Sequence, residues 1–158
     1  MNRKENRQGK VVAVSISERK GTRKRNVDWA LLVPDWGIEG DAHAADWNRQ
    51  VSFLAVESID KIRKMGLEVG PGDFAENITT EDIDLPGLQI GDRLRIGDAE
   101  LEVTQIGKEC HSRCEIFRQA GDCVMPREGI FARVLSGGIV RKGDAVFIRS
   151  AESSHRPE

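Results

Sequence analysis

Short runs of β-branched and apolar residues, separated by glycine-containing turns, dominate the hydrophobic pattern of this chain. Within one of them Leu94 and Ile96 alternate with two arginines, which predicts a strand with one buried and one exposed face. The dipeptide Gly97-Asp98 lies between two such alternating runs and predicts a β-hairpin. Seven short strands at this spacing predict a mainly β fold, a barrel or a sandwich, with a few short helices. The runs of strand length cover residues 11–17, 27–33, 50–55, 92–96, 99–107, 130–135 and 145–150.

Two segments have helical periodicity instead. Gly66 is placed to end a helix over residues 56–66. A shorter helix is expected over residues 112–120, where Ser112 and Glu115 have the spacing of a capping box. The longer helix is expected to bury the face that carries Val56, Ile59, Ile62 and Met65.

Length and charge predict one globular domain. The chain has 158 residues, 24 Lys+Arg against 26 Asp+Glu, and 39% hydrophobic residues. We expect a single domain over residues 10–150 with flexible tails at 1–9 and 151–158. The near-neutral charge argues against nucleic-acid or membrane partners. The polar, basic start lacks the apolar core of a secretory signal, and the longest apolar run is too short to span a bilayer, so we expect a cytoplasmic protein.

The three cysteines, Cys110, Cys114 and Cys123, fall in one short stretch. An odd number so closely spaced does not fit a disulfide framework. Cys114 has Arg113 beside it and Arg118 one helical turn later, and it lies near the start of the predicted helix. Cations and a helix N-terminus both favour a thiolate, so Cys114 is the candidate nucleophile. The alternative is an inert, buried thiol, which we favour for Cys123.

A metal site is the second interpretation of this stretch. Cys110, His111, Cys114 and Cys123 could together bind zinc or an iron–sulfur centre. The spacing lacks the C-x2-C knuckle of structural zinc sites, and no second ligand pair lies elsewhere in the chain. Both interpretations remain open from the residues alone.

Three further segments carry candidate binding residues. Residues 19–25 hold five basic residues in seven, which predicts either a clamp for a phosphate or a solvated hairpin tip. A glycine-flanked acidic turn presents Asp41 and His43, either to a ligand or simply to solvent. In a second glycine-rich turn, Glu76 and Asn77 either point into a cleft or cap the turn.

In order along the chain, several segments resemble the MOSC domain, which is named for the C-terminal domain of molybdenum-cofactor sulfurase. The resemblance covers residues 10–149 and is strongest as an ordered set. Two positions depart from the family pattern: Ala45 stands where glycine is common, and Asn48 where histidine is common. The matching segments are Lys20-Gly21-Thr22, GIEGDAHAADW (37–47), RQVSFLAVESI (49–59), GDFAENITTEDIDL (72–85), IGDRLRIGDAELEVTQIGKECHSRC (90–114) and MPREGIFARVLSGG (125–138).

The resemblance implies a β-barrel-like fold and a role with a molybdopterin-type molybdenum cofactor. Cys114 matches the family cysteine that carries sulfur as a persulfide or ligates molybdenum. Some relatives reduce N-hydroxylated compounds with molybdenum, so the implied activity is that of a sulfur carrier, a transferase or a reductase component. Residues in stretches that line the cofactor cleft of the family are Lys20, Arg23, Asp41, His43, Arg49, Glu76 and Asn77.

The resemblance also implies partners. The chain is too short to include the pyridoxal-phosphate desulfurase domain of full-length sulfurases. We therefore expect the sulfur donor to be a separate protein, a cysteine desulfurase or a molybdopterin-biosynthesis protein, and pyridoxal phosphate to be bound only there.

Overall fold

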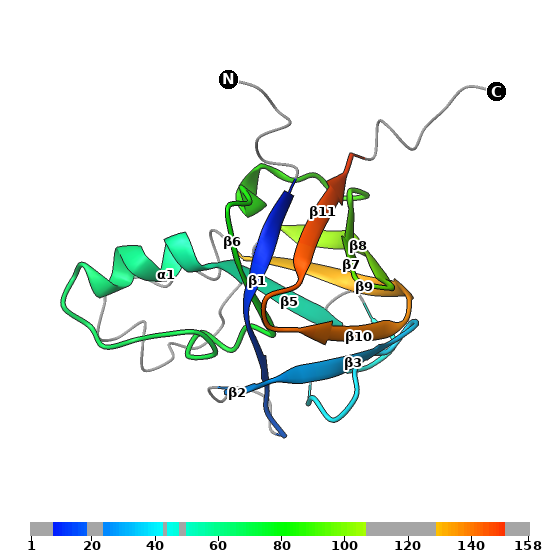
Figure 1. Ribbon diagram of the computed structural model, residues 1–158, viewed down its shortest axis with the longest axis horizontal. Coiled ribbons are helices and arrows are strands. Elements are labelled where there is room, and N and C mark those ends of the chain that lie inside the picture. The colour runs from blue at the N-terminus through cyan, green and yellow to red at the C-terminus, as the bar shows by residue number, and fades with distance from the viewer. Residues whose placement is uncertain (1–7, 19–23, 43, 48–49, 107–128, 151–158) are drawn as a thin grey trace.

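The computed structural model describes residues 8–18, 24–42, 44–47, 50–106 and 129–150 (Figure 1). Within these residues the chain forms strands joined by short turns, one α-helix and one 3₁₀ helix. The elements in chain order are β1 (Gln8–Ile16), β2 (Arg25–Val27), β3 (Trp29–Val33), β4 (Gly37–Ile38), β5 (Val51–Ala55), α1 (Val56–Arg63), β6 (Ile78–Glu81), the 3₁₀ helix η2 (Leu85–Gly87), β7 (Arg93–Ile96), β8 (Ala99–Ile106), β9 (Ile130–Ser136), β10 (Gly138–Arg141) and β11 (Ala145–Arg149).

Seven of the strands close into a barrel. Their order around the ring is β11-β7-β8-β9-β5-β6-β1, and pairing between β1 and β11 closes it. Neighbouring strands are antiparallel except β5 and β6, which are parallel and connected through α1. β2 extends the sheet beyond β1, and β10-β3-β4 form a second, three-stranded sheet beside the barrel (Figure 1). The mainly β, barrel-like fold predicted from the sequence is confirmed.

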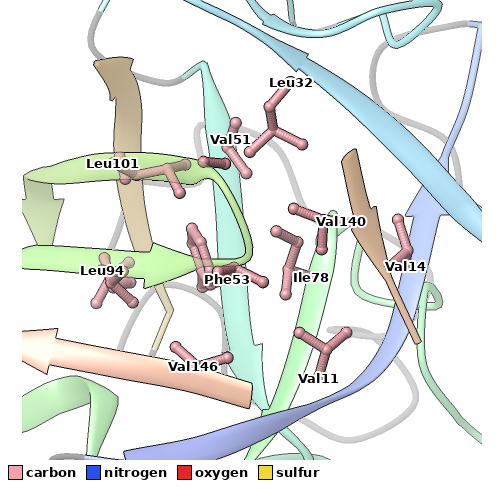
Figure 2. Close-up of a cluster of buried hydrophobic side chains, with 14 of the residues drawn as sticks. Val11, Val14, Leu32, Val51, Phe53, Ile78, Leu94, Leu101, Val140 and Val146 are labelled. Atoms are coloured by element: carbon pink, nitrogen blue, oxygen red, sulfur yellow. The ribbon is translucent and has the colours of Figure 1, made fainter. Parts of the chain in front are cut away.

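The barrel interior is filled by one side of each strand. Leu94 and Leu101, from adjacent strands, are fully buried, as the alternating pattern predicts. The second sheet adds Leu32 and Val140 to the same core, so it packs against the barrel (Figure 2). Burying one such side chain contributes roughly 1.5–3 kcal/mol relative to leaving it exposed. The core therefore holds the two sheets together as one unit.

A second, smaller hydrophobic cluster attaches α1 to the outside of the barrel. Ile59 and Ile62 pack there with Phe131 of β9, together with Leu54, Val69 and Phe74. The prediction for Met65 is wrong, because its side chain is 58% exposed. The helix ends at Arg63, and the turn that follows, with Gly66 at φ +96°, carries Met65 away from the buried face.

Each segment predicted to be a strand overlaps a strand of the structure, and one segment is divided between two strands. The run 27–33 is split at Asp28 between β2 and β3, which belong to different sheets. The predicted hairpin is confirmed, since Ile96 pairs with Ala99 across a two-residue turn. The predicted helix at 112–120 lies outside the described residues. In the described part of the chain, no helix is long and apolar enough to cross a membrane.

Candidate functional site

One outer face of the barrel wall carries a row of polar side chains, and four of them are buried. These side chains lie on, or directly before, β8, β9, β5, β6, β1 and β2, which are neighbours in the sheet. Several are fully or almost fully buried although they point away from the barrel core. We call this surface the polar face; its members are Glu102, Arg133, Gln50, Ser52, Asn77, Ser15 and Asn26.

Asn77 links three strands of the polar face. Its Oδ1 accepts hydrogen bonds from the backbone N–H of Ser52, at 2.9 Å, and from the Ser52 hydroxyl, at 3.1 Å. Its Nδ2 donates to the carbonyl oxygen of Ser15 at 3.1 Å. The Ser15 hydroxyl in turn donates to Oδ1 of Asn26 at 2.7 Å. The side-chain amide of Asn77 therefore fixes β5 and β1 against the start of β6.

Glu76 organises the turn that precedes β6. Its Oε2 accepts hydrogen bonds from Gly72 N–H at 2.7 Å and from the Thr79 hydroxyl at 2.9 Å. Its Oε1 accepts one from Phe74 N–H at 3.2 Å. Burial raises the pKa of Glu76, and the hydrogen bonds to its carboxylate oppose that rise. These contacts match the alternative in which Glu76 caps the turn.

Lys24 and Asp41 form a buried ion pair. Lys24 Nζ lies 2.8 Å from Asp41 Oδ1, and both side chains are 0% exposed. Lys24 Nζ also donates to the Ser17 hydroxyl at 3.2 Å, and Asp41 Oδ1 accepts from Ser17 N–H at 3.0 Å. The sequence placed Lys24 in a basic run at a hairpin tip or clamp and missed this pair. The position of Asp41 directly after Gly40 was the available signal, but nothing in the sequence assigned this carboxylate a cation.

A close backbone contact joins this ion pair to the Glu76 turn. Lys24 N–H donates to the carbonyl oxygen of Gly72 at 2.8 Å. Gly72 has a φ of +93°, and a Cβ there would lie 2.4 Å from the carbonyl oxygen of Lys24. Contacts therefore run without a break from Glu76 through Gly72 and Lys24 to Asp41. The three segments that sequence analysis selected separately meet at this point, beside Ser15 of the polar face.

A groove of about 410 Å³ adjoins the polar face. Its lining includes Trp47, Gln50, Thr104 and Arg133, together with Asp46, Ile90, Glu102 and Val103. The register of β8 shifts at Val103–Gln105, and bulges of this kind commonly redirect side chains near functional sites. We call this feature the Trp47 groove.

Of the predicted site residues, the structure brings together Asp41, Glu76 and Asn77. The others lie outside the described residues: Lys20, Arg23, His43, Arg49, Cys110, His111, Arg113, Cys114, Arg118 and Cys123. Several of them directly adjoin the site in the chain, since Lys24 follows Arg23 and Gln50 follows Arg49. Among the residues that are described, no group of three or more His, Cys, Asp or Glu side chains could hold a metal ion.

Comparison with solved structures finds the same fold in bacterial proteins. The YuaD protein from Bacillus subtilis has a TM-score of 0.76 and 21% identity, over 90% of this chain and 96% of its own. YiiM from Geobacillus stearothermophilus has a TM-score of 0.66 and 18% identity, over 89% and 74%. YiiM from Escherichia coli has a TM-score of 0.62 and 17% identity, over 94% and 79%. At these identities the similarity establishes the fold.

Comparison with sequence families gives a direct match. The model of the MOSC domain matches residues 39–147, more than half of the chain. The match includes the turns with Asp41 and Glu76 and the whole cysteine stretch. A comparison with curated protein sequences finds no match.

Proposed function

Because this chain belongs to the MOSC domain family, we propose that it works with a molybdopterin-type cofactor and that Cys114 carries sulfur for it as a persulfide. Ligation of molybdenum by Cys114 is the other form that this role can take. The observation that carries the proposal is the meeting of three family motifs at the Lys24–Asp41 ion pair. A buried ion pair costs desolvation energy and adds little net stability, which is consistent with a positioning role at a functional site.

The described residues fit a cofactor of this kind. The Trp47 groove has a volume typical of small-molecule sites, and it offers an aromatic ring beside polar groups. Asp41 already neutralises Lys24, so the cofactor phosphate is assigned to Lys20, Arg23 and Arg49. Lys24 and Asp41 instead anchor the two segments that carry these cations. When bound, the cofactor supplies molybdenum.

Sulfur loading of Cys114 is a thiol exchange with a separate donor. The Cys114 thiolate, favoured by Arg113 and Arg118, attacks the terminal sulfur of a persulfide on a cysteine desulfurase. A new S–S bond forms on Cys114, the S–S bond of the donor breaks, and the donor cysteine leaves as a thiolate. Pyridoxal phosphate acts only on that donor.

Mass spectrometry of the loaded protein tests this step. The protein is incubated with a cysteine desulfurase and cysteine, and the peptides that contain each cysteine are weighed. We expect one added sulfur atom on Cys114 in the wild type and in the matched controls C110S and C123S, and none in C114S. Absence of the adduct with every donor tried, or an adduct that persists in C114S, contradicts the proposal.

Two further assays separate the other interpretations. Stoichiometric zinc or iron in protein purified without chelator, lost in both C110S and C123S, would replace the sulfur-carrier role with a structural metal site. Turnover of an N-hydroxylated compound by cofactor-loaded protein with an electron donor would show that the molybdenum reacts while it is bound here.

A further inference from the structure

A second groove lies on the outer surface of the barrel beyond Glu102, which is at the edge of the polar face. It is formed on the outer surface of β7 and β11, whereas β5 and β6 lie across the ring. Its volume is about 410 Å³, and its lining includes Arg93, Arg95, Phe147 and Arg149. We call it the arginine groove. Nothing in the proposed cofactor role uses it.

The arginines of this groove are arranged at a cost to stability. Arg93 and Arg149 lie directly opposite each other on the paired strands, and like charges in this position repel. Glu100 lines the groove and pairs with Arg93 at 3.6 Å, and Asp98 lies at the hairpin turn. The three arginines and two carboxylates that line the groove therefore have a net charge of +1.

Among the residues that the structure describes, two of the three guanidinium groups have no partner. Glu102 faces Arg93 across the strands, but its carboxylate lies 3.1 Å from Arg133. Within the part of the chain that the structure describes, neither Arg95 nor Arg149 makes an ion pair or a side-chain hydrogen bond. Planar guanidinium groups without partners are suited to bind a phosphate through paired hydrogen bonds.

An exposed aromatic ring lies next to these cations. Phe147 is directly opposite Arg95, and its side chain is 47% exposed. An aromatic residue of β11 would point inward if it stood one position earlier or later in the strand. The Arg95–Phe147 pair and the Arg93–Arg149 pair are two residues apart on each strand, which separates them by about 7 Å. A ribose spans a similar length between a base and its 5′-phosphate.

We propose that the arginine groove binds a nucleoside monophosphate. The base stacks on the exposed face of Phe147, beside Arg95, and the phosphate is held by Arg149 and Arg93. Glu100 orients Arg93 toward the phosphate through their ion pair. This site is independent of the molybdopterin role and of Cys114.

Titration with AMP, monitored through the backbone amide signals of the ¹⁵N-labelled protein, tests the proposal. We expect shifts confined to β7, β11 and the other residues that line the groove, 98–100 and Ser136, and an AMP affinity at least tenfold higher than that of inorganic phosphate or adenosine. The double variant R95Q/R149Q should weaken AMP binding at least tenfold. F147L should weaken AMP binding severalfold and leave phosphate binding unchanged.

A matched control separates a site from a general charge effect. Arg141 and Lys142 are exposed and lie outside the groove, so R141Q/K142Q removes two positive charges elsewhere and should leave AMP binding unchanged. Circular dichroism of each variant checks that it is folded. The proposal is overturned by the absence of localised shifts with AMP, by equal weakening in the control, or by phosphate binding as tightly as AMP.

Discussion

At the scale of single residues, the Lys24–Asp41 ion pair leads to a prediction about the stability of the protein. K24M leaves the Asp41 carboxylate buried without its cation, so we expect the free energy of unfolding to fall by about 3–5 kcal/mol in urea denaturation. K142M removes one exposed positive charge and is the matched control, expected to change stability by less than about 0.5 kcal/mol. The double variant K24M/D41L should regain part of the loss. Equal stability of K24M and K142M would contradict a buried, uncompensated charge.

Glu76 gives a prediction about pH. Burial raises the pKa of its carboxyl above the ordinary value of 4.5, so the folded protein holds this proton more tightly than the unfolded chain. The stabilisation from this bound proton is fully present below pH 4.5, and it is lost as the pH rises through the pKa of Glu76 in the folded protein. E76Q cannot titrate and loses one acceptor, which costs about 1–3 kcal/mol. We therefore expect the destabilisation by E76Q, measured in urea, to shrink as pH rises.

E57Q is the control for this experiment. Glu57 also accepts a backbone hydrogen bond, from Asp82 N–H at 2.9 Å, but in an exposed position. Subtracting the E57Q profile corrects for the loss of one negative charge. A destabilisation by E76Q that stays constant or grows with pH, after this subtraction, is inconsistent with a raised pKa.

At the scale of structural elements, the conformation of the turn before β6 depends on Gly72. G72A adds a Cβ 2.4 Å from the Lys24 carbonyl oxygen, at a residue whose φ is +93°. Gly143 has a similar φ of +96° and nothing within 4 Å of an added Cβ, so G143A isolates the cost of the conformation, about 1–2 kcal/mol. Thermal and urea unfolding should show a clearly larger loss for G72A. Similar losses for both variants would show that the contact with Lys24 is not tight.

The elements that could be predicted are those whose pattern is local. Alternation identified β7 and β8, because one face of each strand fills the barrel core. β4 and β10 were not predicted, because they are short, contain glycine and are stabilised by pairing with β3. Met65 was placed wrongly because periodicity does not show where a helix ends.

The candidate site was predictable in its parts but not in its connections. Asp41, Glu76 and Asn77 were selected from turn chemistry and family resemblance, and all three are buried. Lys24 was read only as part of a basic run, because the sequence does not show that its ammonium group meets a carboxylate 17 residues away. Long-range pairing of this kind depends on the closed barrel.

For the molecule as a whole, barrel closure explains how distant motifs come together. Pairing of β1 with both β6 and β11 completes the ring and places the base of the 19–25 segment beside the Glu76 turn. The same closure puts β7 and β11, which form the arginine groove, across the ring from β5 and β6. The architecture thus provides two grooves, and the polar face adjoins the one that is lined by Trp47.

The most direct test of the account is the pterin content of protein purified from a host that makes molybdopterin, measured by the fluorescence of the oxidised pterin. We predict that wild-type protein retains pterin, that K20Q/R23Q loses most of it, and that K20Q/R23Q still accepts sulfur on Cys114. Protein without pterin, or equal pterin in wild type and K20Q/R23Q, would contradict the claim that Lys20 and Arg23 hold the phosphate of a molybdopterin-type cofactor.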